Sequence, residues 1–415
     1  MSFSRALQKT VSKRVLKTLV VLVVFLPLWT YMQASLTVNR SLVFIRSADD
    51  GNVRADDNVA TESADAVRCS HNCGHSGTTE SGSITSSSEP LSRQFSTPAV
   101  TEEVLRRHRD DVMPFCENPT RSSAPRWPSK EPVTAQELAE RFPMMQLGGH
   151  YSPSNCTPRE KLAILIPYRN RSVHLHTLLP NLIPMLIKQN ADFTIFVVEQ
   201  AMPTRFNKGV LFNAGFLEAL KLGDFDCFIL HDVDMIPLND ANTYQCRSDG
   251  PVHFMAGVNK FHYGLSYSWL LGGVLGFTKD QYKAVNGFSN LYFGWGAEDD
   301  DMFLRLKKKR MDYHRKGKDV GLYDMIRHSR DKGWEPINSR FSITHFSTRR
   351  IDDDGLNTAV YSRTSLRQLP LYTWIRVFVD MKQVYEKAPE YMKDVIEKAS
   401  RENAALLSPG SVEDH

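Results

Sequence analysis

Three stretches decide the fold: 161–167 (KLAILIP), 193–198 (FTIFVV) and 227–234 (CFILHDVD). Each contains an apolar run with the length of a buried strand, and apolar residues at helical spacing fill the intervals between them, interrupted by two prolines in the first interval. Strands that alternate with helices predict an α/β sheet with helices on both faces. In such sheets ligands bind at the carboxyl ends of the strands. The third run leads directly into Asp232 and Asp234, so this pair is predicted to lie at a ligand site.

The aspartate pair has the chemistry of a metal site. Two carboxylates at i and i+2 on an extended segment point to the same side. Hard oxygen ligands at a strand end suit Mn2+ or Mg2+ holding a diphosphate. The alternative is a solvated acidic turn, since D-x-D is common by chance. The apolar strand before the pair and Met235-Ile236-Pro237 after it favour the metal site.

A second acidic segment, 294–301 (GWGAEDDD), carries four successive carboxylates. Their mutual repulsion requires that some are held by cations or hydrogen bonds. Helical spacing resumes at Phe303, which places the acids at a helix start, where the dipole favours negative charge. The alternative is an acidic helix start without function. The flanking glycines allow close backbone approach, and Trp295 offers a flat face to a sugar ring, so we predict a sugar-binding catalytic site.

Two further motifs carry charge. The loop 167–171 (PYRNR) follows the first strand, and its arginines can bind a diphosphate while Tyr168 stacks on a base. The alternative is an ordinary basic loop. The segment 325–331 (MIRHSRD) places a methionine and a histidine three residues apart. A thioether is a poor ligand for Mn2+, so residue chemistry alone does not select Met325.

The N-terminal part predicts a membrane anchor. A basic segment, 1–17, precedes an uncharged apolar stretch, 18–38. About twenty such residues span the roughly 30 Å of hydrocarbon as a helix, and the preceding Lys and Arg place the N-terminus in the cytosol. The alternative is a cleaved signal peptide. Residues 39–110 have the composition of a flexible stem, 111–380 are predicted to form the lumenal catalytic domain, and 381–415 a polar helical extension.

Charge and the stem cysteines add two expectations. A formal net charge of +4 is too small to suggest nucleic-acid binding. Cys69 and Cys73 lie in the stem, where a local or intersubunit disulfide and a zinc site both remain open. The stem or the membrane span could also join two copies into a homodimer.

Together these segments resemble the β-1,4-galactosyltransferase family, inverting Golgi enzymes of the GT-A class. The resemblance covers roughly 116–371. It is carried by Pro167–Arg171, Phe206-Asn207, Asn213–Phe216, Asp232–Asp234, Gly272–Val274, Gly294–Asp301, Met325–Asp331 and Asp354–Asn357. It implies a Rossmann-like mixed sheet that binds a nucleotide sugar, and a single-pass type II Golgi membrane protein with its catalytic domain in the lumen.

The resemblance also implies roles for individual residues. Asp299 would be the general base, with Glu298 and Asp300 holding the donor and acceptor sugars. The Mn2+ ligands would be Asp234, Met325 and His328. The UDP-sugar site would be lined by Pro167, Tyr168, Arg169, Arg171, Phe206, Asp232, Val233, Gly273 and Trp295, with Trp295 on a mobile loop. The acceptor would contact Tyr267, Arg340 and Phe341, and the disulfides would be Cys116–Cys156 and Cys227–Cys246.

Four positions depart from the family pattern. Phe293 stands for the usual Trp, Ala297 for Gly and Lys208 for Arg, and none of these changes removes a catalytic group. Leu270 stands where galactose-using members have Tyr; members with a small aliphatic residue there resemble N-acetylgalactosaminyltransferases. We therefore predict Mn2+-dependent β1,4 transfer to terminal GlcNAc, with UDP-GalNAc favoured over UDP-Gal. The alternatives are a plain galactosyltransferase, an enzyme acting on xylose, and a non-catalytic carbohydrate-binding protein.

Overall fold

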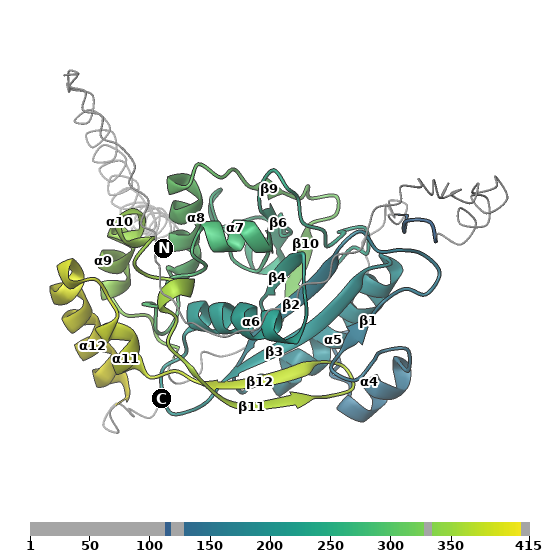
Figure 1. Ribbon diagram of the computed structural model, residues 1–415, viewed down its shortest axis with the longest axis horizontal. Helices are drawn as coiled ribbons and strands as arrows, with labels where there is room; N and C mark the ends of the chain where they lie inside the picture. The colour runs from purple at the N-terminus through teal and green to yellow at the C-terminus, as the bar shows by residue number, and fades with distance from the viewer. Residues whose placement is uncertain (1–112, 118–127, 328–333, 408–415) are drawn as a thin grey trace, which may run out of the picture. The chain divides into compact units, whose positions relative to one another are not determined.

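The computed structural model describes residues 113–117, 128–327 and 334–407 (Figure 1). The predicted tail, membrane span and stem, including Cys69 and Cys73, and the predicted metal ligand His328 lie outside these ranges. The described residues all belong to one compact unit, 96–415. No helix within them has both the length and the apolar character needed to cross a membrane.

The three predicted strands form the centre of the large sheet. They are β2 (Lys161–Tyr168), β3 (Asp192–Gln200) and β4 (Cys227–His231), and β2 pairs in parallel with both of the others. The helices α5 (Ser172–Lys188) and α6 (Lys208–Leu222) connect them in sequence. The predicted alternation of strand and helix is therefore confirmed. Their carboxyl ends meet at one edge, where the polar motifs lie.

The remaining strands make the sheet mixed, as the family resemblance implies. Its strand order is β11-β12-β3-β2-β4-β8-β6-β9, with β1 also paired to β3. The added strands are β1 (His150–Tyr151), β6 (Val252–His253), β8 (Val274–Thr278), β9 (His314–Arg315), β11 (Ser362–Gln368) and β12 (Thr373–Phe378). A separate three-stranded sheet contains β5 (Met235–Pro237), β7 (Gly257–Val258) and β10 (Leu322–Met325). β8 runs antiparallel to β4, so the chain doubles back beside the aspartate pair.

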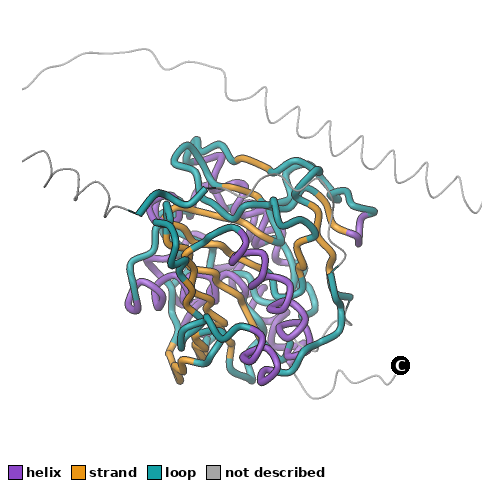
Figure 2. Tube along the Cα trace, turned by 90° about the vertical axis from the view of Figure 1, so that its right-hand side faces the viewer, coloured by secondary structure: helices purple, strands orange, loops and turns teal. Residues whose placement is uncertain are grey.

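Alternating side chains of the central strands fill two cores, one on each face of the sheet. Figure 2 shows the strands with helices packed around them. On β2, Leu162, Ile164 and Ile166 pack in the core that contains the buried side of α5. Ala163 and Leu165 pack in the core that contains α6. Because successive strand residues point to opposite faces, a continuous apolar run is needed when both faces are covered. This explains why the run contains no polar residue between Leu162 and Ile166.

Helix α5 continues through two prolines that sequence reasoning treats as interruptions. Pro180 and Pro184 both lie inside it, and each lacks an N–H for the helical hydrogen bonds. Fully buried Leu178, Leu182 and Leu186 hold this helix against the sheet. Packing of the apolar face therefore outweighs the local cost of the prolines.

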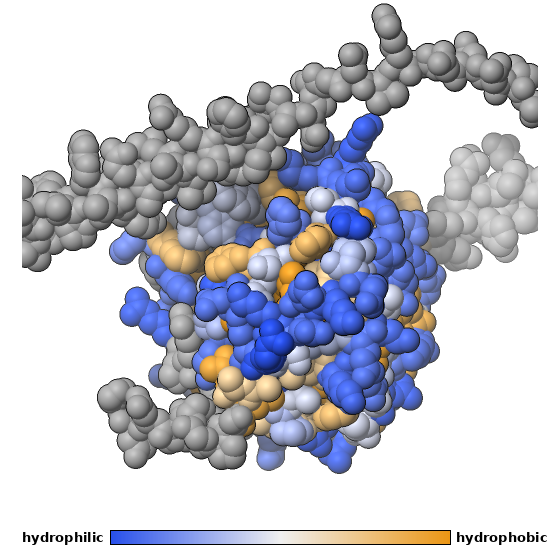
Figure 3. All heavy atoms as spheres, turned by 90° about the vertical axis from the view of Figure 1, so that its left-hand side faces the viewer, coloured by the Kyte–Doolittle hydropathy of each residue, from blue (hydrophilic) through white to orange (hydrophobic). Residues whose placement is uncertain are grey.

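The other helical elements are α4 (Ala135–Arg141), η2 (Asn259–Phe261), α7 (Lys279–Ala284), α8 (Glu298–Lys308), α9 (Ser339–His345), α10 (Ser347–Arg350), η3 (Leu356–Thr358), α11 (Met381–Glu386), η4 (Glu390–Met392) and α12 (Lys393–Leu407). The C-terminal helices α11 and α12 belong to the same core as α6. Val384 and Ile396 are buried there, and the ring of Tyr385 lies 5.3 Å from that of Phe293. The outer face over these helices is mainly hydrophilic, with small apolar patches (Figure 3). The helical segment predicted as an extension is thus packed into the domain.

Two disulfides have the pairing that the family resemblance implies. Cys116 bonds Cys156, with Cα atoms 4.9 Å apart, and Cys227 bonds Cys246, with Cα atoms 5.6 Å apart. The second bond fastens the start of β4 to the chain that follows β5. It therefore supports the strand that carries the aspartate pair at its other end.

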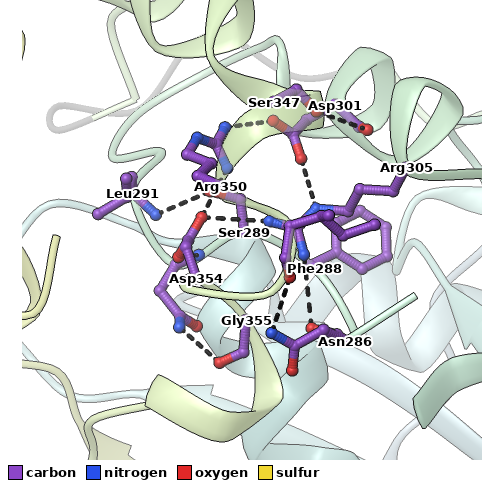
Figure 4. A network of polar contacts seen from close by, with 12 residues as sticks. Asn286, Phe288, Ser289, Leu291, Asp301, Arg305, Ser347, Arg350, Asp354 and Gly355 are labelled. Carbon is purple, nitrogen blue, oxygen red and sulfur yellow. Dashed lines mark hydrogen bonds and ion pairs between the residues drawn. The ribbon is translucent and has the colours of Figure 1, made fainter. Parts of the chain in front are cut away.

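A buried network of two arginines and two aspartates anchors α8 (Figure 4). Asp301 pairs with Arg305 at 2.6 Å and also with Arg350. Asp354 pairs with Arg350 at 2.6 Å and with Arg305 at 3.2 Å, and accepts a hydrogen bond from the backbone N–H of Asn290. All four charged side chains are almost completely buried. The network joins α8, α10 and the 354 loop.

We expect Asp301→Asn to destabilise the protein by about 3–5 kcal/mol, because it leaves buried guanidinium groups without their counter-charge. Chemical denaturation of the purified protein measures this loss. Lys309→Met is the control: it breaks an ion pair with the exposed Asp352 and should cost no more than about 1 kcal/mol. Equal losses in the two variants would contradict an anchoring role for the network.

Candidate active site

The aspartate pair lies in a tight turn between the two sheets. The N–H of Asp232 donates to the carbonyl of Gly273 at 2.9 Å, and the N–H of Met235 donates to the carbonyl of Asp232 at 3.3 Å. The predicted extended conformation is therefore wrong, because the chain turns there from β4 into β5 of the smaller sheet. Val233 is buried while both aspartates remain partly exposed. The pair is still accessible at the carboxyl end of β4.

Strand pairing brings the predicted ligand Met325 beside this turn. β10 runs antiparallel to β5 with Met325 opposite Met235, and the N–H of Ile326 donates to the carbonyl of Asp234 at 2.9 Å. The carboxamide oxygen of Asn259 accepts the N–H of Met325 at 2.9 Å. Asp234 and Met325, which are far apart in sequence, are thus neighbours in the fold.

The second acidic segment begins α8, as the sequence predicts. Ala297 precedes the helix in a left-handed conformation with φ of 80° and makes no side-chain cap. Gly294 also has a positive φ, and a Cβ there would lie 2.4 Å from the carbonyl oxygen of Glu335. The first turn contains all four acids, near the positive end of the helix dipole. Asp301 belongs to the buried network described above, so its role is structural.

Lys208 lies between three carboxylates, two from the start of α8 and one from the aspartate pair. Its Nζ lies 2.8 Å from Oε1 of Glu298, 3.1 Å from both carboxylate oxygens of Asp299 and 3.6 Å from Oδ1 of Asp232. Asn207 caps α6 just before it by accepting the N–H of Val210. Sequence reasoning noted Lys208 only as a departure from Arg and missed this position. The available signal was a cation at a helix start in a chain with two clusters of acids.

Burial and mutual repulsion shift the protonation of this cluster. Burial raises the pKa of Asp299 to about 7, with Lys208 opposing the shift and Glu298 and Asp232 adding to it. Burial likewise raises the pKa of Asp232 to about 6. Burial disfavours the charged form of Lys208, but the carboxylates around it more than offset this, and its pKa lies well above the ordinary value. Asp299 is therefore poised to exchange a proton near neutral pH.

Leu270 lies next to Asp299. A Cβ placed on Gly272 would lie 2.6 Å from Oδ2 of Asp299 and 3.7 Å from Cδ1 of Leu270. Both side chains therefore lie near Gly272, which has no side chain of its own. This brings the predicted donor-selectivity residue beside the predicted base. Gly273, with φ of 95°, continues this backbone to the aspartate turn.

Aromatic side chains border the acids on the predicted acceptor side. Tyr267 donates to Oδ1 of Asp300 at 2.9 Å, and its ring lies 5.1 Å from that of Trp269, which is half-exposed. Arg340 lies with its guanidinium 4.2 Å from the ring centre of the exposed Phe341. Trp295 is also half-exposed. Exposed aromatic faces beside carboxylates are typical of sugar-binding surfaces.

Several predicted nucleotide-binding residues form a stack joined to the Trp295 loop. Phe206 and Trp334 lie face to face with ring centres 4.5 Å apart. Arg169 lies over Phe206 at 5.1 Å and Arg171 over Trp334 at 5.3 Å. The carbonyl of Phe206 accepts the N–H of Gly294 at 2.8 Å, which joins this stack to the Trp295 loop. Pro167 is buried at the end of β2 and Tyr168 is half-buried. Trp334 belongs to the stack but was not predicted from the sequence.

Comparison with known proteins gives the family. The N-terminal region of glycosyl transferase group 7 matches residues 117–247, and the N-terminal domain of galactosyltransferase matches 252–329. β-1,4-Galactosyltransferase 4 of Cricetulus griseus is 44% identical over 245 residues, which cover 59% of this chain and 71% of that protein. The chain belongs to the β-1,4-galactosyltransferase family.

Other family members are also similar. The β-N-acetyl-D-glucosaminide β-1,4-N-acetylglucosaminyl-transferase of Lymnaea stagnalis is 47% identical over 318 residues. These cover 64% of this chain and 65% of the snail protein, slightly less than two thirds of its length. A crystal structure of Drosophila β-1,4-galactosyltransferase 7 with manganese, UDP-Gal and xylobiose is 28% identical, covers 53% of this chain and 94% of that one, and has a TM-score of 0.45. The family models and the relative covered to 71% of its length are what make the chain a member of this glycosyltransferase family.

Proposed function

We propose that the protein transfers an N-acetylhexosamine from its UDP-sugar in β1,4 linkage to a terminal GlcNAc. The observation that carries this proposal is Leu270 beside Asp299 over Gly272. Leucine is shorter than the Tyr of galactose-using members and has no hydroxyl, which leaves room for a 2-acetamido group. UDP-GalNAc is the predicted donor; the name of the snail relative adds UDP-GlcNAc, which carries the same acetamido group. We place the reaction in the Golgi lumen, on a type II membrane protein.

The residues support a single inverting displacement. Asp299 accepts the proton of the acceptor 4-hydroxyl while that oxygen bonds to the anomeric carbon of the donor. The bond from that carbon to the diphosphate breaks, UDP leaves, and the α-linkage of the donor becomes β in the product. Asp300, oriented by Tyr267, binds the acceptor, and Glu298 the donor sugar. Lys208 keeps the carboxylate of Asp299 in place.

The site fits a divalent cation. Among the described residues, Lys208 is the one cation that forms ion pairs with Asp232, Glu298 and Asp299, and Oε2 of Glu298 is buried without a hydrogen-bond partner. This excess of negative charge, made of hard oxygen donors, suits Mn2+. Asp234 and Met325 would hold the ion together with His328. When bound, it would neutralise charge on the leaving diphosphate.

The base assignment predicts both a rate loss and a pH dependence. Because Asp299 acts only when ionised and its pKa is raised to about 7, wild-type kcat/KM should rise with pH through about 7. Asp299→Asn should lower kcat by at least about 10²-fold and abolish this rise, since an amide accepts no proton at neutral pH. UDP-sugar binding, measured by calorimetry, should persist. A loss of only a few-fold would transfer the role to Glu298 or Asp300.

The metal assignment predicts that Asp234→Ala abolishes transfer and weakens Mn2+ binding, because it removes a hard oxygen ligand. Titration calorimetry with Mn2+ alone reads the binding separately from activity. Asp249→Ala is the control, since Asp249 is exposed and pairs only with Arg247 and His314 among the described ion pairs. Unchanged Mn2+ affinity in Asp234→Ala would reject Asp234 as a ligand.

The donor assignment predicts that Leu270→Tyr shifts preference toward UDP-Gal. The added ring fills the space left for the acetamido group, and a clash of this kind changes selectivity by about tenfold or more. Competition between UDP-Gal, UDP-GalNAc and UDP-GlcNAc on one GlcNAc acceptor measures the change. Leu222→Tyr, at the exposed end of α6, is the control. A wild type that prefers UDP-Gal, with no effect of Leu270→Tyr, would show a plain galactosyltransferase.

A further inference from the structure

The segment 266–273, which carries Leu270, is fastened to the fold largely by side chains. Between η2 and β8 it follows no regular strand or helix. Its internal backbone bond from the N–H of Leu270 to the carbonyl of Tyr267 is long, at 3.4 Å. Three of its carbonyl oxygens, those of Ser268, Leu270 and Gly272, instead accept hydrogen bonds from two side chains. These side chains therefore decide where Leu270 lies.

Arg315 supplies two of these bonds directly. It lies on β9, and its Nη1 donates to the carbonyl of Ser268 at 2.7 Å while its Nη2 donates to the carbonyl of Leu270 at 2.6 Å. The flat guanidinium fixes the directions of both donors at once. The backbone of Leu270 is thus held from one side by a rigid fork. A lysine at this position, with all its donors on one nitrogen, could not make both of these bonds together with the bond to His253.

The third bond passes through His253. Nε of Arg315 donates to Nδ1 of His253 at 2.9 Å, and Nε2 of His253 lies 2.9 Å from the carbonyl of Gly272. Burial lowers the pKa of His253 to about 3, so the ring is neutral. Since Nδ1 accepts from Arg315, Nε2 carries the proton and donates to Gly272. The bond from Arg315 therefore fixes the tautomer that holds the glycine against Asp299.

We propose that Arg315, directly and through His253, is a positioning residue that fixes Leu270 relative to Asp299 and thereby sets which donor sugar is accepted. The inference rests on the proposed function and extends it to a residue that need not touch either sugar. Its contacts are to Ser268, Leu270 and His253, and the strand pairing of β6 with β9 places Arg315 opposite His253. In this proposal the edge strand β9, which carries Arg315, positions the residue that selects the donor.

The test is a double-mutant cycle between Arg315→Lys and Leu270→Tyr in the full-length protein. The readout is the ratio of kcat/KM for UDP-GalNAc to that for UDP-Gal. Arg315→Lys alone should lower this ratio at least about fivefold, because Leu270 is no longer held in one place. Combined with Leu270→Tyr, its effect should be clearly non-additive, as for residues that act through one another. Arg247→Lys, an exposed arginine paired with Asp249, is the matched control.

A second measurement separates this inference from the proposed function. Hydrogen exchange should accelerate in peptides covering 266–273 of Arg315→Lys and stay unchanged elsewhere. Calorimetry with the two UDP-sugars reads donor selectivity without turnover. A wild type that transfers none of the three sugars from UDP-GalNAc, UDP-GlcNAc and UDP-Gal would reject the proposed function, while exchange and binding would still decide the role of Arg315. The positioning role of Arg315 would be overturned by any of three results: equal losses of kcat/KM for both donors in Arg315→Lys, additive effects in the double-mutant cycle, or unchanged hydrogen exchange in 266–273.

Discussion

The structure depends on how the first turn of α8 is held between two sets of charges. On one side Asp301 is locked into the buried network with Arg305 and Arg350. On the other side Lys208 pulls Glu298 and Asp299 toward the end of β4. Four adjacent acids would otherwise repel one another and fray the helix start. Because the buried arginines hold one acid and Lys208 holds two others, this repulsion is offset and the carboxylates are fixed in position.

Sequence reasoning succeeded where burial on two faces leaves a strong pattern. The runs that became β2, β3 and β4 contain few polar residues because helices cover both faces, and their alternation with helices was predicted correctly. It failed in the turn at Asp232, where the chain changes sheets, because no local pattern reports such a change. It also treated the prolines of α5 as interruptions, since the compensating contacts come from distant strands.

For the candidate site, the sequence singled out residues of distinctive chemistry but not the residues that support them. The acids of α8, the aspartate pair and the basic loop after β2 were singled out by type and position. Lys208, Trp334 and Arg315 were missed as site residues because their importance arises from contacts with segments remote in sequence. The family resemblance predicted both disulfides, which the structure contains. The roles proposed for Asp299 and Leu270 gain support from their shared closeness to Gly272, which sequence spacing could not reveal.

The division of labour at α8 limits how this segment can vary between relatives. Helix residues follow one another at about 100° around the axis, as 3.6 residues make a turn. One residue inserted or deleted between Glu298 and Asp301 would rotate the acids relative to one another, so that a buried arginine would face the wrong position and a carboxylate of the cluster would turn inward. Changes of residue type that keep the count, such as Phe293 and Ala297 in this chain, leave that phase intact. Natural variation here should therefore conserve the length of the segment and the acids held by the network and by Lys208, while its other side chains change.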